Sequence, residues 1–300
     1  MSRRNTPRIS FIGFGEAGQA IASGLRDAGI ERIAAWDILF PDPAGAPLKT
    51  AGELIGVRMA SSAGDAVRET DMVISAVTAA SSVDAARSVA PHLTGNPYYL
   101  DINSVSPGRK QETAKLLGER ARYVDVAVIA AIHPARHRTP LLISGPYAEN
   151  ISPLLRELDM QLAVVGPEIG SAAAIKMIRS VMIKGIEALT LECFLAANRA
   201  GVLEEVTASL KNNYPTLDWA TIADYNLERM ASHGERRAAE MEESAATLRE
   251  LGLDPLMVDS TVKRQREMGA IGKRETVRKT LKSGRAAMLG AISAAVKDRD

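Results

Sequence analysis

The stretch Arg8-Ile-Ser-Phe-Ile-Gly-Phe-Gly-Glu-Ala-Gly18 is a short apolar strand that runs directly into three glycines at a fixed spacing. Gly13 permits a tight turn, Gly15 lets the backbone approach a diphosphate, and Gly18 lets a helix pack closely on the strand. A helical pattern follows, and its N–H groups and positive dipole end favour an anion at its start. A second apolar strand then ends in Asp37. The stretch therefore predicts the first strand–helix–strand unit of a dinucleotide-binding sheet.

The carboxylate of Asp37 bears on which dinucleotide is bound. It stands about 20 residues after the glycines, where an acid accepts hydrogen bonds from the adenosine ribose. NADP carries a 2′-phosphate there, which a carboxylate repels and an arginine attracts. Arg32 is near in sequence, but Ile38-Leu-Phe40 follow Asp37 directly. We therefore expect NAD, with NADP less favoured; if Asp37 is only a solvated strand end, the preference stays open. The residues assigned to the cofactor are Gly13, Phe14, Gly15, Glu16, Ala17, Gly18, Asp37, Ala76 and Val77.

Length and composition predict a soluble protein of about two domains. The 300 residues are 46% hydrophobic and 24% charged, which is ordinary for a globular chain. A net charge of +1 gives no electrostatic reason to expect a nucleic acid or a membrane surface as partner. Cys193 is the only cysteine and the histidines show no metal spacing, so we expect no disulfide and no metal. Residues 1–7 are basic without an apolar segment, and the apolar runs are short, which predicts a cytoplasmic protein.

The periodicity of the chain changes near Gly166. Before it, apolar runs typical of strands buried on both faces of a parallel sheet alternate with helical patterns. The expected strands are 8–13, 32–37, 72–77, 98–102, 123–129, 141–144 and 162–165, and the expected helices are 17–28, 50–54, 63–68, 81–90 and 107–119. After Gly166 only helical patterns follow, at 170–200, 203–212, 219–232, 235–251, 256–268 and a last one that ends at Val296. We expect an α/β fold: an N-terminal Rossmann domain with a doubly wound parallel sheet (residues 1–166), then an all-helical substrate and dimerisation domain (residues 167–300). A substrate cleft is expected between them.

Lys176 is the candidate for proton transfer in the second half. Apolar residues flank it on both sides, which disfavours the charged ammonium and favours a general base. Ser180 lies one turn later on the same helix face and can bond the lysine or a substrate. Lys184 and Glu187 continue this polar stripe. On the residues alone, a lysine whose ammonium simply reaches solvent is an equal alternative.

Three motifs resemble those of the β-hydroxyacid dehydrogenases, the family of 3-hydroxyisobutyrate, tartronate semialdehyde and 6-phosphogluconate dehydrogenases. The first is the glycine segment, residues 11–18. The second, Asp101-Ile-Asn-Ser-Val-Ser-Pro107, is similar to the family's D-x-S-T-x-x-P. The third, Gly170-Ser-Ala-Ala-Ala-Ile-Lys-Met-Ile-Arg-Ser180, is similar to G-x-G-x-x-x-K-x-x-x-N around the catalytic lysine. The resemblance spans roughly residues 8–270 and implies that Lys176 is catalytic.

The chain departs from this family pattern near the expected substrate. Ser180 replaces the family's Asn and offers one donor where the amide has two, and Ala172 replaces the second glycine. The substrate-orienting segment D-x-P-V-S-G-G corresponds to Asp125-Val-Ala-Val-Ile-Ala-Ala131, so the Ser-Gly-Gly that resembles a carboxylate clamp is missing. We expect an apolar group to face the substrate there, unless this is only a locally different strand end.

The second half resembles a branch of the family with a phosphogluconate-dehydrogenase-like helical domain, some members of which act on phenylserine. His233, with Arg236 and Arg237, falls near the place where relatives carry a Lys-Asp-Leu motif. This segment is expected to bind a substrate carboxylate or, alternatively, to be a solvated helix start. Asn103 and Ser104 are expected to hold the substrate's polar end or the nicotinamide amide.

Together these observations predict an NAD(P)-dependent oxidoreductase. It would oxidise the hydroxyl of a small β-hydroxy acid or β-hydroxy amino acid, with Lys176 as general base and Ser180 orienting it. Two alternatives stay open: an imine or keto reductase on the same fold, which usually lacks this lysine, and a dinucleotide-sensing protein without turnover. A homodimer is expected because apolar residues occupy more than one face of the long helix.

Overall fold

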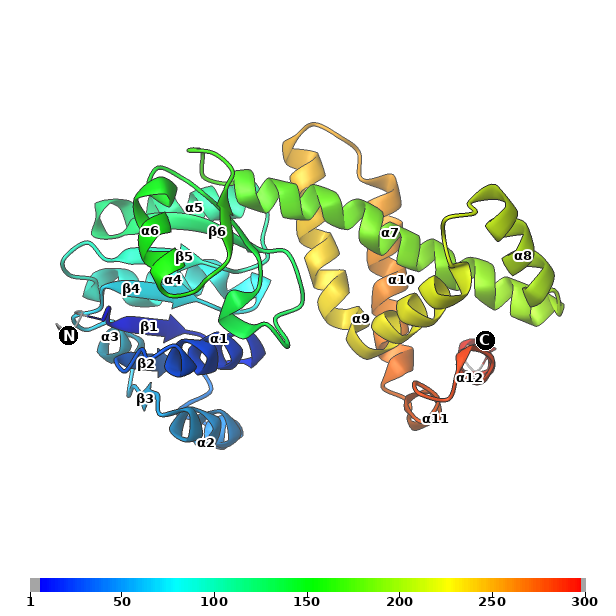
Figure 1. The fold of residues 1–300 in the computed structure, drawn as a ribbon, viewed down its shortest axis with the longest axis horizontal. Coiled ribbons are helices and arrows are strands. Elements are labelled where there is room, and N and C mark those ends of the chain that lie inside the picture. The colour runs from blue at the N-terminus through cyan, green and yellow to red at the C-terminus, as the bar shows by residue number, and fades with distance from the viewer. Residues whose placement is uncertain (1–5, 298–300) are drawn as a thin grey trace. The chain divides into compact units, whose positions relative to one another are not determined.

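The computed structural model describes residues 6–297, and all strands of that part lie in one eight-stranded sheet (Figure 1). The strands are β1 (Ile9–Ile12), β2 (Ile33–Trp36), β3 (Arg58–Met59), β4 (Met72–Ser75), β5 (Tyr98–Asp101), β6 (Arg122–Val128), β7 (Leu141–Ser144) and β8 (Leu162–Val164). Their order is β3-β2-β1-β4-β5-β6-β7-β8, so the connections reverse direction between β1 and β4. In open parallel sheets a ligand binds at such a point, outside the carboxyl ends of the strands.

Helices cover both faces of this sheet, which confirms the doubly wound architecture. Because side chains alternate along a strand, Ile9 and Phe11 of β1 join one apolar cluster and Ile12 joins the other. The first cluster also receives residues of α1 (Glu16–Asp27), α2 (Ala46–Ile55) and α6 (Ala148–Glu157). The second receives residues of α3 (Ala63–Ala66), α4 (Ser82–Val89) and α5 (Pro107–Leu117). Short 3₁₀ turns lie at Pro43–Gly45, Ala79–Ser81, Ala90–His92, Gly118–Arg120 and Arg136–Arg138.

One pairing departs from the predicted parallel arrangement, so that β7 and β8 run opposite to the other strands. β7 runs antiparallel to β6, with Val126 opposite Ile143. A parallel pair needs a crossover connection, usually through a helix, to return the chain to the same edge. The connection between β6 and β7 contains only a 3₁₀ turn, so the chain comes straight back beside β6. The other pairings are all parallel.

Three further elements differ from the prediction. α6 was not predicted because it holds Pro153 in its interior, where proline removes a helix hydrogen bond. α2 begins at Ala46, before the predicted start, since Pro47 falls in its first turn, where proline is well tolerated. β3 has only two residues and no apolar alternation that predicts a strand.

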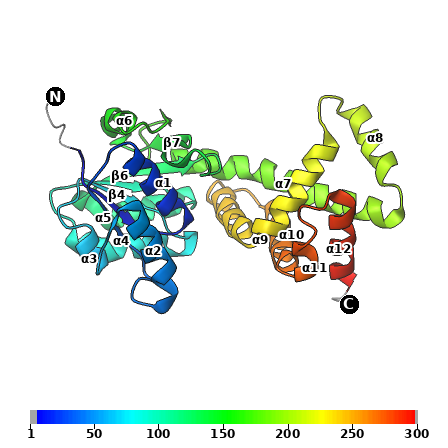
Figure 2. The same ribbon diagram turned by 60° about the horizontal axis from the view of Figure 1, so that its bottom comes forward.

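After β8, helices are the only regular elements of the described chain, as predicted. They are α7 (Ser171–Ala200), α8 (Leu203–Asn213), α9 (Trp219–Glu250), α10 (Leu256–Gly272), α11 (Glu275–Arg278) and α12 (Arg285–Lys297). The predicted break at Gly234 is wrong, because α9 passes through it without interruption and lies along α10 (Figure 2). A Cβ on Gly234 would stand 2.3 Å from the carbonyl oxygen of Gln265. Close packing against α10 therefore outweighs the roughly 1 kcal/mol by which glycine disfavours a helix.

The chain divides into two compact units, residues 1–176 and 177–300. The change from strands to helices occurs earlier, after β8, so the first turns of α7 belong to the sheet unit. Lys176 is the last residue of that unit. No described helix is long and apolar enough to cross a membrane.

Candidate active site

The glycine segment after β1 combines three different structural demands. Gly13 has φ +90°, and a Cβ there would stand 2.3 Å from the carbonyl oxygen of Ala76. A Cβ on Gly18 would stand 2.7 Å from the carbonyl oxygen of Gly13, so this glycine permits the close packing of α1. Gly15 differs, because its φ is −73° and a Cβ there would meet nothing within 4 Å. The space in front of Gly15 is open, and an approaching ligand explains the glycine where internal packing does not.

The start of α1 suits the diphosphate of a dinucleotide. Gly15 is the N-cap residue and provides no side-chain hydrogen bond to the first turn. A helix start of this kind offers N–H donors and a partial positive charge to an anion. Glu16, in the same turn, does not fit this pattern, since its exposed carboxylate repels a nearby anion. Overall the residues present fit the cofactor that the motif predicts.

Asp37 lies at the carboxyl end of β2, beside the glycine segment. Its Oδ2 accepts a hydrogen bond of 2.7 Å from the Phe14 amide, and its Oδ1 accepts one of 3.0 Å from Leu39. Each carboxylate oxygen keeps a further lone pair for a ligand hydroxyl. Arg32 precedes β2 and therefore lies at the opposite end of the strand from Asp37. Ile38, which follows Asp37, is 84% exposed.

Ser104 and Lys176 meet at the same edge of the sheet. Ser104 follows the carboxyl end of β5, and the Lys176 ammonium donates a hydrogen bond of 2.5 Å to its Oγ. Both side chains are half-buried, so they remain within reach of a ligand. β5 is one strand away from β4, which lies next to β1 with its glycine segment. The predicted catalytic lysine and one predicted substrate residue are thus brought together.

The side chain of Asn103 makes internal hydrogen bonds, and its predicted contact with the substrate or the nicotinamide amide stays a prediction. Asn103 is 4% exposed, and its side chain joins the ends of two strands. Its Oδ1 accepts a hydrogen bond of 2.7 Å from the Val77 amide, and its Nδ2 donates one of 3.0 Å to Ser75. Asn103 therefore holds the loops after β4 and β5 together, beside Ser104.

A charged cluster lies fully buried behind this edge. Lys110, on α5, is 1% exposed, and its Nζ lies 3.1 Å from Asp101 Oδ1 and 3.4 Å from Asp125 Oδ1. Tyr123 donates a hydrogen bond of 2.9 Å to Asp101 Oδ2. Burial, reinforced by the charges of Asp101 and Asp125, raises the pKa of Tyr123 well above its usual value, so the phenol remains a donor.

Asp125 is fully buried and binds the start of α7, although the segment it opens resembles a substrate-orienting one. Its Oδ2 accepts hydrogen bonds of 3.1 Å from the amides of Gly170 and Ala173 and one of 3.0 Å from the Ser144 hydroxyl. Ser144 in turn accepts a hydrogen bond of 3.0 Å from the Ala172 amide. Two strand side chains thus satisfy the first N–H groups of α7, the helix that carries Lys176. Residues 129–131 lie farther along, past the carboxyl end of β6.

The polar stripe of α7 continues into the helical unit, where it is buried. Lys184 donates a hydrogen bond of 3.2 Å to Ser180 and lies 3.0 Å from Glu240. Glu187 is bound by Arg237, and Gln265 donates a hydrogen bond of 2.8 Å to it. The Arg237 guanidinium therefore pairs with Glu187 inside the helical unit, which weakens its predicted role in binding a substrate carboxylate.

His233 lies half-buried on α9 of the helical unit. Burial, together with Arg229 and Arg236, lowers its pKa. Its predicted contact with substrate stays a prediction. Among the described residues, no group of three or more His, Cys, Asp or Glu is placed to hold a metal.

Sequence reasoning missed Lys110 and Ser144. Lys110 belongs to a helix of mostly polar sequence, in which one lysine looks like any solvated residue. The signal that was available is the pair of acids at Asp101 and Asp125, each of which follows apolar residues of a strand. Carboxylates in such positions are buried in a two-sided sheet and need a partner.

Comparisons with known proteins agree with this architecture. Residues 8–166 match the NAD binding domain of 6-phosphogluconate dehydrogenase, and residues 197–268 match a domain of unknown function, DUF1932. A conserved hypothetical protein from Sinorhizobium meliloti 1021 is 36% identical, with 96% of each chain covered and a TM-score of 0.76. The conserved protein MTH1747, reported as structurally similar to 3-hydroxyacid dehydrogenases, is 31% identical over 88% of this chain and 97% of its own, with a TM-score of 0.70.

The fold alone is shared with a 3-hydroxyisobutyrate dehydrogenase of Mycobacterium tuberculosis. That protein is 16% identical, with 96% of this chain and 99% of its own covered and a TM-score of 0.70. The match to the NAD binding domain spans more than half of the present chain. The chain belongs to the β-hydroxyacid dehydrogenase family, with an NAD(P)-binding domain of the 6-phosphogluconate dehydrogenase type.

Proposed function

We propose that the protein is an NAD-dependent dehydrogenase that oxidises the hydroxyl of a small β-hydroxy acid or β-hydroxy amino acid. The observation that carries the proposal is the contact between Lys176 and Ser104 at the carboxyl edge of the sheet. A protein that only senses a dinucleotide does not need an amine held at this edge of the sheet, beside the strands that carry the cofactor site. The contact therefore favours catalysis over sensing.

Lys176 is the general base of this proposal. In its neutral form it accepts the proton of the substrate hydroxyl, and Ser104 holds the amine in place for that transfer. Ser180 lies one turn further along α7, but its hydroxyl accepts a hydrogen bond from Lys184 in the helical unit, so it has no part in this proposal. The bound nicotinamide supplies the acceptor for the hydride from the carbon that carries the hydroxyl. Asn103 keeps the loop of Ser104 rigid through its bonds to Ser75 and Val77.

The preference for NAD rests on Asp37 and its surroundings. The carboxylate is available to ribose hydroxyls, and it repels a 2′-phosphate. The exposed residue next to it is Ile38, and Arg32 lies at the far end of β2. No lysine or arginine directly follows Asp37, so no positive charge at that position compensates the charge of a 2′-phosphate.

The apolar segment past β6 supports a substrate with an apolar group. Ile129, Ala130 and Ala131 stand where relatives carry the Ser-Gly-Gly that resembles a carboxylate clamp. They follow the strand that lies beside β5, whose end carries Ser104. A β-hydroxy amino acid with an aromatic or branched side chain fits this composition better than a small hydroxy dicarboxylate.

A substrate panel tests the proposal. NAD reduction is followed with β-hydroxy acids and β-hydroxy amino acids, and NADH oxidation with the matching ketones and cyclic imines. Turnover of a hydroxy compound that Lys176→Ala abolishes supports the proposal. Turnover of imines alone makes the protein a reductase, and binding of NADH with no turnover in either panel favours a sensor.

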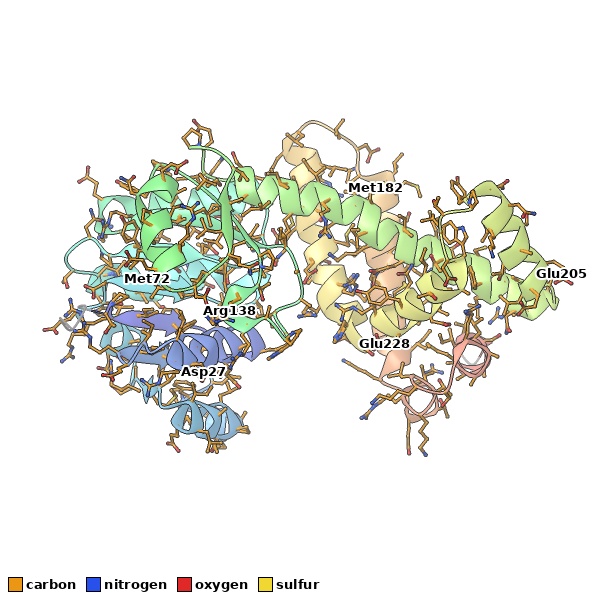
Figure 3. All side chains as sticks on the ribbon, in the orientation of Figure 1. Asp27, Met72, Arg138, Met182, Glu205 and Glu228 are labelled. Atoms are coloured by element: carbon orange, nitrogen blue, oxygen red, sulfur yellow. The ribbon has the colours of Figure 1, made fainter. Side chains whose placement is uncertain are left out.

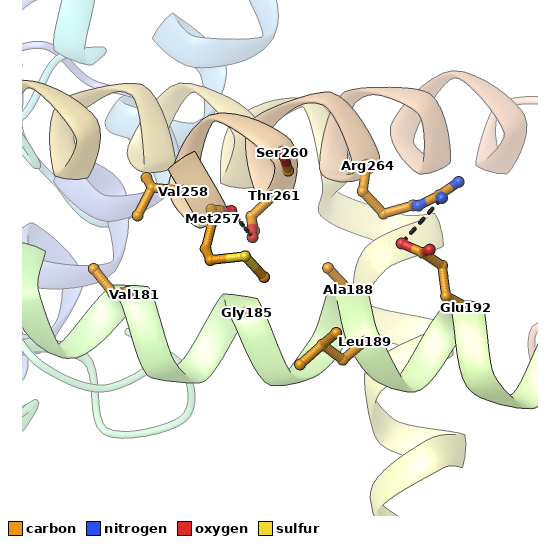
Figure 4. Close-up of a pocket in the computed structure, with 10 residues that line it drawn as sticks. All are labelled: Val181, Gly185, Ala188, Leu189, Glu192, Met257, Val258, Ser260, Thr261 and Arg264. Carbon is orange, nitrogen blue, oxygen red and sulfur yellow. Dashed lines mark hydrogen bonds and ion pairs between the residues drawn. The ribbon is translucent and has the colours of Figure 1, made fainter. Parts of the chain in front are cut away.

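We further propose that the protein works as a homodimer through the exposed face of α7. Ile178, Met182 and Leu189 are 47%, 65% and 58% exposed, and Met182 is labelled on α7 in Figure 3. A groove between α7 and α10 borders this face, with Gly185 and Met257 among its lining residues (Figure 4). Apolar surface of this extent on one helix is typical of an interface. Sedimentation at micromolar concentration tests this: Met182→Glu should give a monomer that still binds NADH, and a wild-type monomer would contradict it.

A further inference from the structure

Lys110 is a buried charged group that the proposed chemistry does not use directly. Its Nζ donates a hydrogen bond of 2.6 Å to the backbone oxygen of Asp101 and one of 3.4 Å to that of Val126. The same atom makes ion pairs with the carboxylates of Asp101 and Asp125. One ammonium therefore joins the end of β5 to the middle of β6 through both backbone and side chains.

Lys110 is connected to Ser104 through the Asp101 carboxylate. Asp101 Oδ1, which Lys110 contacts, also accepts a hydrogen bond of 3.0 Å from the Asn103 amide. This bond sets the path of the chain as it leaves β5. Ser104 is the next residue, so the position of its hydroxyl depends on the Asp101 carboxylate.

Lys110 is connected to Lys176 through the Asp125 carboxylate and the start of α7. Asp125 is the second carboxylate that pairs with Lys110. It accepts hydrogen bonds from the amides of Gly170 and Ala173 at the start of α7. Lys176 lies three residues after Ala173, less than one turn of the helix. The start of α7 is held by Asp125 and Ser144, so these two side chains set the direction in which Lys176 leaves the sheet.

The energetics favour a role in geometry over one in stability. Burying an ion pair costs desolvation that its attraction often fails to recover, and apolar residues of similar size are frequently as stable. Here two carboxylates share one ammonium, and the positive end of α7 offsets the remaining negative charge. The charges thus fix two otherwise separate segments to one point.

We propose that Lys110 is a positioning residue that sets the Ser104–Lys176 pair through Asp101 and Asp125. The proposal rests on the proposed function of Lys176 as the base. Its consequence is measurable, because a displacement of about 1 Å at a reacting group lowers kcat by about 100-fold.

The main test compares two buried serines. Ser144→Ala removes the hydroxyl that bonds Asp125 and the Ala172 amide. Ser10→Ala is the matched control, because Ser10 is a buried strand serine in the same unit with two hydrogen bonds that lead away from α7, to Ala66 and Thr70. Lys110→Met is the direct variant, and if it fails to fold, the serine pair decides.

Two readouts separate positioning from stability. The first is the kcat, with its pH profile, on a substrate identified by the panel, together with NADH affinity. The second needs no substrate: the rate at which an acylating reagent labels Lys176, measured by peptide mass spectrometry. Ser144→Ala removes two buried hydrogen bonds and is expected to change kcat and the labelling rate about fivefold or more, with NADH affinity kept. Ser10→Ala is expected to lower thermal stability similarly and to leave both readouts unchanged.

The outcomes are distinct. If Ser144→Ala matches Ser10→Ala in both readouts, or if folded Lys110→Met keeps normal kcat and labelling, the positioning role is overturned. If Lys176→Ala keeps normal kcat, the proposed function fails instead, and the labelling rate still reports whether Ser144 and Lys110 place Lys176. A changed labelling rate in Ser144→Ala, with Ser10→Ala like wild type, supports the proposal.

Discussion

The Nζ atom of Lys176 lies 2.5 Å from the Oγ atom of Ser104, which joins residues 72 positions apart in the sequence. One comes from the loop after β5 and the other from the first turns of α7. The two residues belong to segments far apart in the chain, so the pair exists only because the sheet and the start of α7 are fixed together.

Lys176→Ala should lower kcat by about 100- to 10,000-fold, the usual contribution of a placed general base. NADH affinity should change little, because the glycine segment after β1 holds the cofactor. Stopped-assay kinetics and nicotinamide fluorescence measure the two quantities. Lys115→Ala removes an exposed lysine of α5 and serves as the control. A variant with kcat near wild type would show that the base lies elsewhere.

Ser104→Ala should lower kcat about fivefold to tenfold, since it removes one hydrogen bond to Lys176. The effect should be much smaller than that of Lys176→Ala, because the amine remains. Combined with Lys176→Ala, the serine variant should add almost nothing, since the two act as a unit. Additive losses in the double variant would argue that Ser104 works independently of the lysine.

Gly15→Val should prevent NADH binding and leave the thermal midpoint unchanged. A Cβ there would meet no other protein atom within 4 Å, and the valine side chain would fill the open space in front of α1. Gly13→Ala is the contrasting variant, because its Cβ would overlap the Ala76 carbonyl and cost about 1–3 kcal/mol of stability. Fluorescence titration and thermal unfolding of both variants separate the two roles. NADH binding by Gly15→Val at wild-type affinity would place the diphosphate elsewhere.

Ile38→Arg should raise the affinity for NADPH about tenfold relative to NADH. The side chain is 84% exposed beside Asp37, and a guanidinium there would bond a 2′-phosphate, a charged interaction worth about 1.5–3 kcal/mol. Titration of wild type and variant with both cofactors measures the ratio. A wild-type protein that already binds NADPH more tightly would contradict the role given to Asp37.

The stability of the fold should fall as the pH drops below about 6.5, in part because of His137. This side chain is 4% exposed and both ring nitrogens lack a hydrogen-bond partner among the described residues. Burial, with Arg138 and Arg136 nearby, lowers its pKa, so below the ordinary histidine value the unfolded chain binds a proton that the fold excludes. His137→Phe should flatten the decline of the thermal midpoint between about pH 7 and pH 5. His133→Gln, at an exposed histidine, should not, and equal profiles for all three proteins would exclude His137 as a cause.

Local patterns decided much of this protein. The glycine spacing, the acid at Asp37 and the long runs of apolar residues predict the doubly wound sheet, the helical second half and the cofactor edge from neighbouring residues alone. Each of these signals is short-range: a turn needs a glycine at its own position, and a strand buried on both faces needs apolar residues along its own length.

Tertiary structure decided what short-range signals do not contain. Gly234 predicts a helix break, but α10 packs against it and α9 continues. In its own helix Lys110 looks like an ordinary polar residue, and only the fold brings Asp101 and Asp125 from two strands into contact with it. Asp125 resembles a substrate residue by sequence and instead binds the start of α7, because the amides of Gly170 and Ala173 meet it only when β6 and α7 are assembled. Burial and pairing depend on residues far apart in the chain, so only the folded structure could show that the ammonium of Lys110 and the Lys176–Ser104 pair belong to one connected network.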